Sequence, residues 1–104
     1  MVTEKEKLIA IQFENVLQKN NVPIGSYALI DNLPFDGILI YKEDNEWLVS
    51  AVSRGKIYRT FGRFQTILYA ALFSTIFLVM PEQIGKIHKD FYDALNQNVP
   101  EYDG

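Results

Sequence analysis

The feature that most constrains this chain is an uncharged, strongly apolar stretch from Ile67 to Met80. Its 14 residues are too few for a membrane span, which needs about 18–20. They are apolar on every side of a helix rather than along one stripe. Such a helix is stable in water only when other elements cover most of its surface. The sequence therefore predicts a buried helix from about Phe64 to Val79, ended by Pro81.

Two amphipathic segments can provide this cover. Thr3 and Glu6 have the spacing of a capping box, which predicts a helix from about Glu4 to Asn20. A second helix is expected from about Glu82 to Gln97. Each segment carries one apolar stripe at helical spacing. The stripes are Ile9, Phe13, Val16 and Leu17 in the first, and Ile84, Ile87, Phe91 and Leu95 in the second.

Short β-like runs lie between the first helix and the apolar one. They cover residues 26–30, 37–42, 46–53 and 56–61, and Asp44-Asn45 and Arg54-Gly55 supply tight turns. Both faces of the third run are apolar, so we expect a central strand with Trp47 in the core. Strands and helices in separate blocks indicate an α+β fold. We expect one domain over 1–104, with an N-terminal helix, a three- to four-stranded antiparallel meander and two C-terminal helices packed on one sheet face.

Composition excludes most kinds of chemistry. The 104 residues include no Cys and one His, so disulfides, thiolate catalysis and multi-His metal sites are ruled out. Thirteen acidic and ten basic residues give a formal net charge of -3, which speaks against a nucleic-acid partner. We expect no cofactor and no metal. Since no signal-peptide or membrane pattern is visible, we also expect a cytoplasmic protein.

The stretch from Asp31 to Glu46 is acidic, with five carboxylates against one lysine. Its acids lie at two predicted turns. Such a patch attracts a basic protein and speeds association, although a solvated surface has the same composition. The candidate partner-binding residues are Phe35, Asp36, Tyr41, Glu43, Asp44 and Glu46, with the two aromatic residues as anchors.

Three arginines follow on the second hairpin and the turn beyond it: Arg54, Arg59 and Arg63. Guanidinium groups bind phosphate and carboxylate well, so an anion or small-ligand site is the alternative prediction. Charged residues on an edge strand also discourage aggregation of sheets, and this interpretation stays open beside the first.

The segment from Tyr41 to Phe77 carries a family resemblance. It reads Tyr41-Lys-Glu-Asp-Asn-Glu-Trp-Leu-Val49, then Ser53-Arg-Gly-Lys-Ile-Tyr-Arg-Thr-Phe61, then Ala70-Ala71 on the apolar helix. This series of strands, tight turns and an Ala-containing helix resembles the small α+β immunity proteins of bacterial polymorphic toxin systems. The resemblance implies a protein encoded beside a toxin that binds and occludes that toxin. It implies no catalytic residues.

Three functions are therefore considered. The first is a toxin-neutralising immunity protein whose partner is a cognate protein toxin. The second is a regulatory module that binds a small ligand or an anion. The third is an enzyme built on His88, which we disfavour because His88 borders an apolar stripe and Asp90 points elsewhere on the helix. Surplus apolar residues on the first helix leave room for a homodimer.

Overall fold

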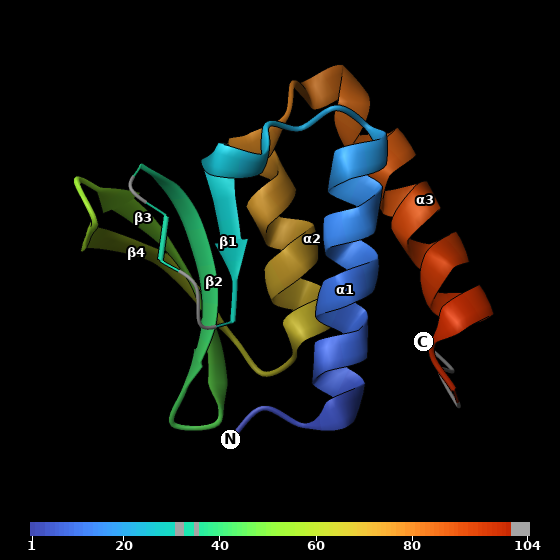
Figure 1. Ribbon diagram of the computed structural model, residues 1–104, viewed down its shortest axis with the longest axis horizontal. Coiled ribbons are helices and arrows are strands. Elements are labelled where there is room, and N and C mark those ends of the chain that lie inside the picture. The colour runs from blue at the N-terminus through green and yellow to red at the C-terminus, as the bar shows by residue number, and fades with distance from the viewer. Residues whose placement is uncertain (31–32, 35, 101–104) are drawn as a thin grey trace.

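The computed structural model describes residues 1–30, 33–34 and 36–100, and it confirms the α+β fold (Figure 1). One helix comes first, a four-stranded sheet follows, and two helices complete the described chain. The elements are α1 (Glu4–Lys19), a 3-10 turn η1 (Ile24–Ser26), β1 (Tyr27–Leu29), β2 (Gly37–Glu43), β3 (Glu46–Ser53), β4 (Lys56–Phe64), α2 (Ile67–Leu78) and α3 (Pro81–Asn98).

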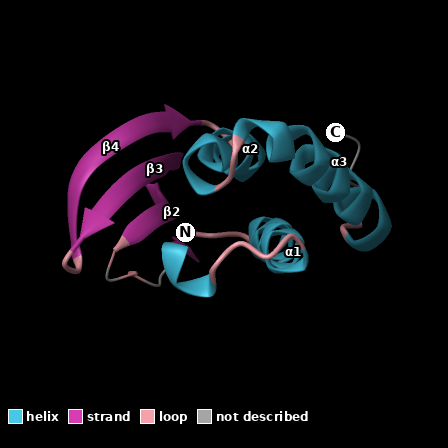
Figure 2. Ribbon diagram, turned by 90° about the horizontal axis from the view of Figure 1, so that it is seen from above, coloured by secondary structure: helices cyan, strands magenta, loops and turns pink. Residues whose placement is uncertain are grey.

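The three helices lie on one side of the sheet, as predicted (Figure 2). The strand order is β1-β2-β3-β4, and β2, β3 and β4 form an antiparallel meander. Asp44 and Asn45 join β2 to β3 with φ angles of 52° and 66°, and Arg54 and Gly55 join β3 to β4 with 53° and 76°. Positive φ at both central residues matches the twist of the flanking strands. Both predicted hairpin turns are therefore confirmed.

β1 differs from the expected meander because it pairs with β2 in the parallel direction. Parallel neighbours usually need a long crossover between them. Here β1 has only three residues, a length of roughly 10 Å. A strand this short needs only a short connection before the chain returns to the beginning of β2. Ile30 begins this return with a φ of 73°.

α2 lies at the centre of the core, as its apolar sequence predicts. It packs against β2, β3 and β4 and against both α1 and α3. Ala70 and Ala71 are completely buried. Ser74 and Thr75 are also buried, and their hydroxyls donate to backbone carbonyls one turn earlier, each at 2.7 Å. Among the described residues, neither α2 nor another helix is long and apolar enough to cross a membrane.

β4 continues to Phe64, beyond the predicted end at Phe61. Gly62 resembles a strand break in the sequence, but it pairs with Val49 on β3. A Cβ at this position would lie 2.9 Å from the ring of Phe64. Glycine therefore lets the ring pack over the strand, and α2 begins at Ile67 rather than at Phe64.

A largely buried carboxylate ties the N-terminus to the sheet. Glu6 accepts the N–H of Thr3 at 2.9 Å, which completes the predicted capping box. It also accepts Nζ of Lys42 at 2.9 Å and Nε1 of Trp47 at 2.7 Å. Trp47 is completely buried, as predicted. Burial raises the pKa of Glu6, but the three donors outweigh it and hold that pKa below its ordinary value.

Replacement of Glu6 tests this link. Glu6→Gln should lower the free energy of unfolding at neutral pH by on the order of 1–3 kcal/mol, because three donors lose a charged acceptor. A carboxyl with a lowered folded pKa stabilises the fold above its ordinary pKa, and the stability is lost as pH falls through the lowered value. Urea titrations followed by circular dichroism should therefore show a steeper loss of stability in acid for the wild type than for the variant.

Glu4→Gln is the matched control, because the side chain of Glu4 is 90% exposed and is 3.5 Å from Lys7. Exposed pairs of this kind contribute little, so the control should keep both the stability and the acid response of the wild type. An acid response of Glu6→Gln equal to that of the wild type would contradict the proposed role of the carboxylate.

Candidate functional site

Three of the predicted acidic residues gather at the tip of the β2–β3 hairpin. Glu43 and Glu46 face each other across the two strands, and Asp44 occupies the turn. Arg63 on β4 is 3.5 Å from Glu46, and the two side chains are 53% and 45% exposed. An exposed ion pair of this length contributes little. The tip therefore keeps a net negative charge toward solvent.

Asp36 lies at the other end of β2. The seven residues of this strand place it roughly 20 Å from the hairpin tip. Its Oδ1 accepts the N–H of Arg54 at 3.0 Å, which ties the start of β2 to the β3–β4 turn. The acids that form one stretch in the sequence are thus divided between two ends of the sheet. Phe35, predicted as an anchor beside Asp36, lies outside the described residues.

Tyr41 is half-buried on the sheet face opposite the helices. It packs against a small cluster of buried apolar residues from β1, β2 and β3, namely Ala28, Leu39 and Val52. This face is therefore closed by side chains rather than left as an open apolar surface. Only part of the Tyr41 ring is available to a partner.

The three predicted arginines do not converge. Arg54 lies in the turn before β4, and Arg63 lies near the far end of that strand beside Glu46. Arg59, between them, lies over the ring of Phe61, with its guanidinium carbon 5.4 Å from the ring centre. The nine residues of β4 extend over roughly 30 Å. One small anion therefore cannot contact all three side chains.

His88 links α3 to α2. Its Nε2 is 2.9 Å from Oγ1 of Thr75 and 3.2 Å from the carbonyl oxygen of Leu72. The Thr75 hydroxyl donates to that same carbonyl, so a proton on Nε2 suits both oxygens. Asp90 bonds to Lys86 instead. This geometry fits a histidine at the edge of the core rather than a catalytic base.

A groove of about 610 Å³ opens where α2 ends and β4 begins, and we call it the end groove. Segments of η1, β2, β3, β4 and α2 line it. Asp36 is the one charged residue among the described lining residues, and Ser26 and Ser53 add hydroxyl groups. The lining residues are Pro23, Ser26, Asp36, Gly37, Ile38, Ala51, Val52, Ser53, Tyr58, Phe61, Phe77 and Leu78.

Aromatic rings form one wall of the end groove. Phe61 of β4 and Phe77 of α2 stack with ring centres 4.2 Å apart and planes 19° apart. Phe73 supports Phe77 from the edge, at 5.5 Å. Tyr58 is 67% exposed and Phe77 is 37% exposed. Rings that hold one another in place while facing solvent are well suited to contact an apolar or cationic group.

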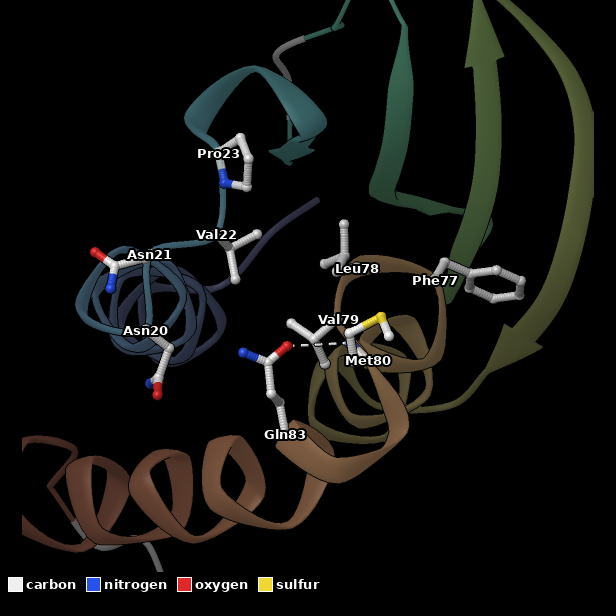
Figure 3. Close-up of a pocket in the computed structure, with 9 residues that line it drawn as sticks. All are labelled: Asn20, Asn21, Val22, Pro23, Phe77, Leu78, Val79, Met80 and Gln83. Atoms are coloured by element: carbon white, nitrogen blue, oxygen red, sulfur yellow. Dashed lines mark hydrogen bonds between the residues drawn. The ribbon is translucent and has the colours of Figure 1, made fainter.

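A second hollow of about 380 Å³ adjoins the end groove and shares Pro23, Phe77 and Leu78 with it. In Figure 3 the ring of Phe77 points toward the strands, whereas Leu78 faces the segment that contains Pro23. Oε1 of Gln83 accepts the N–H of Met80 at 3.1 Å, which fixes the turn between α2 and α3. The end of α2 thus separates two adjoining recesses.

Sequence reasoning did not identify the end groove. Its residues come from five elements, and Phe77 belongs to a helix whose sequence does not reveal which side stays exposed. Asp36, a predicted partner-binding residue, does line the end groove. Tyr58 and Phe61 on a predicted edge strand are further pointers, since large aromatic residues are common at contact surfaces.

The end groove offers one carboxylate, hydroxyl groups and aromatic walls, a set suited to binding an apolar or cationic group. No cluster of three or more metal-ligating side chains occurs among residues 1–30, 33–34 and 36–100. Comparison of the chain with protein families, characterised proteins and solved structures finds no match.

The wall of the end groove can be tested at Gly37. Its φ is 151°, and a Cβ would clash with the backbone oxygen of Ser26. Gly37→Ala should therefore destabilise the fold by roughly 1–3 kcal/mol or more. Gly85→Ala in α3 is the control, because a Cβ there meets nothing within 4 Å. It should raise the free energy of unfolding by at most about 1 kcal/mol, since alanine favours a helix more than glycine does. Thermal unfolding should show a lower midpoint for Gly37→Ala and a higher midpoint for Gly85→Ala than for the wild type. A midpoint of Gly37→Ala equal to that of the wild type would contradict the contact of η1 with β2.

Proposed function

We propose that this chain is a cytoplasmic immunity protein that binds a cognate toxin domain and neutralises it by occlusion, with no catalysis of its own. The observation that carries the proposal is the end groove, an aromatic-walled recess of about 610 Å³ lined by the Asp36 carboxylate. The hot-spot residues of protein interfaces are large side chains that fill pockets of this kind on the partner. The resemblance of residues 41–77 to small α+β immunity proteins supports a toxin as the partner.

The chemistry of the end groove favours a basic anchor from the toxin. One oxygen of Asp36 accepts the N–H of Arg54, and a carboxylate has further acceptor positions. Tyr58 and Phe77, which are both exposed in part, line the same groove. Arginine fits both features, because its planar guanidinium pairs with carboxylates and stacks on aromatic rings.

The acidic hairpin tip contributes at an earlier step of binding. Glu43, Asp44 and Glu46 project from the end of the sheet that lies away from the end groove. Exposed charges at this distance act mainly on the rate of encounter with an oppositely charged protein. We therefore assign steering to the tip and anchoring to the end groove.

A small basic ligand is the second candidate occupant. The volume of the end groove, about 610 Å³, lies within the range of roughly 300–1,000 Å³ that is usual for ligand sites. The separated arginines do not favour an anion. A thermal-shift screen with amines, amino acids and phosphates distinguishes the two candidates. A rise of several degrees that Asp36→Asn abolishes would favour a ligand, and its absence would favour a protein partner.

The anchoring role predicts the effect of Asp36→Asn. The amide oxygen still accepts the N–H of Arg54, so the fold should be retained while the charge is lost. With the toxin domain taken from the neighbouring reading frame, dissociation should become about 10- to 100-fold faster. Asp93→Asn on α3 removes an equal charge from an exposed ion pair with Lys89 and should not change binding. Surface plasmon resonance would measure both rates, and failure of the wild-type chain to restore growth beside the toxin would overturn the proposed function.

The steering role predicts a different kinetic change. Glu43→Lys with Glu46→Lys keeps a like-charged pair across the hairpin. It loses only the exposed pair of Glu46 with Arg63, which contributes little, so the stability should fall only slightly below that of the wild type. Association at low salt should slow about tenfold or more, with little change in dissociation. Glu82→Lys with Asp93→Lys makes the same change of charge on α3 and is the control. Equal association rates for the two double variants would show that the tip has no special part in binding.

A further inference from the structure

We propose that the outer face of α2 joins two copies of this chain through a helix-to-helix contact. This outer face consists of Tyr69, Ile76 and Met80, which are 58%, 53% and 60% exposed, with the half-buried Leu72 and Phe73 between them. In Figure 2, α2 lies between β4 and α3, and no described element covers its remaining side. The proposal is independent of toxin binding, because the end groove lies at the end of the helix.

The spacing of the exposed residues fits a second helix as the occupant. Tyr69, Phe73 and Ile76 follow at intervals of four and three residues, and the exposed Met80 lies beyond the end of α2, in extended backbone before α3. Alternation of four and three is the spacing of a seam between two packed helices. A row of exposed residues at this spacing is not required for contact with an extended strand or a small ligand.

The absence of charge favours a second copy over a foreign protein. No Asp, Glu, Lys or Arg occurs from Phe64 to Met80. The hydroxyls of Ser74 and Thr75 are turned inward and bonded to the backbone of their own helix. A two-fold contact must be complementary to itself, and an uncharged apolar face meets that condition without repulsion. Interfaces between identical subunits are also more apolar than transient interfaces between different proteins.

The flanking strand limits how the two copies meet. Lys56 and Arg59 are exposed on β4, the edge strand beside α2. Pairing of two β4 edges would bring like charges together. The helices, and not the sheets, are therefore the elements in contact.

The available area sets the strength of the dimer. The exposed parts of Tyr69, Ile76 and Met80, with those of the half-buried Leu72 and Phe73, amount to roughly 400 Å² in each copy, from typical side-chain areas. A pair of copies would bury about 800 Å², an area typical of weak, transient contacts rather than of stable dimers. We therefore expect reversible association with a dissociation constant in the micromolar range.

Sedimentation velocity of the full chain between about 2 and 200 µM tests the proposal. The mass of the wild type should rise with concentration from 12.0 kDa toward twice that value. Ile76→Glu places a charge in the contact and should stay monomeric. Ile11→Glu is the matched control, since Ile11 is 51% exposed on α1, and it should associate as the wild type does. Circular dichroism should show that both variants are folded.

A covalent measurement keeps the test decisive if Ile76→Glu fails to fold. The chain has no Cys, so Ile76→Cys forms a disulfide only between two copies. Mild oxidation should convert it to a covalent dimer far more completely than Ile11→Cys. A wild type that remains monomeric at every concentration would overturn the proposal. Loss of association in Ile11→Glu but not in Ile76→Glu would also overturn it, because the contact would then lie on α1.

Discussion

The burial of α2 is the constraint on which the rest of the structure depends. A helix with no charged residue cannot remain in water by itself, and here the sheet, α1 and α3 cover three of its sides. Ala70 and Ala71 allow these neighbours to approach closely. None of the elements that the structure describes covers the fourth side. The end groove and the outer face of α2 both arise because the helix carries more apolar surface than the other elements can cover.

Sequence predicts this structure well wherever a few neighbouring residues decide the outcome. Thr3 and Glu6 satisfy each other within one helical turn, so the start of α1 depends on nothing distant. Asp44-Asn45 takes the positive φ angles of a hairpin turn by itself. Trp47 is predicted to be buried because both faces of its strand are apolar, although its bond to Glu6 links residues 41 positions apart and has no local pattern.

The features that sequence did not predict depend on distant contacts. The parallel direction of β1 is possible because this strand is only three residues long and needs no long crossover before β2. The extension of β4 through Gly62 depends on the ring of Phe64 lying over the strand. For the candidate site, the sequence located the acidic turns but not their separation, because the length of β2 divides Asp36 from Glu43. The end groove forms only when five elements meet.

The position of Trp47 has a consequence for optical measurements. It is the single tryptophan of the chain, it is completely buried, and its indole N–H is 2.7 Å from a Glu6 oxygen. It also lies at the opposite end of β3 from the end groove. Its emission should report the intact core and the charge of one carboxylate, and should not respond to a partner that docks in the end groove. In a mixture with a tryptophan-containing partner protein, a change in emission on binding would therefore originate in the partner, because this protein contributes a nearly constant signal to fluorescence titrations.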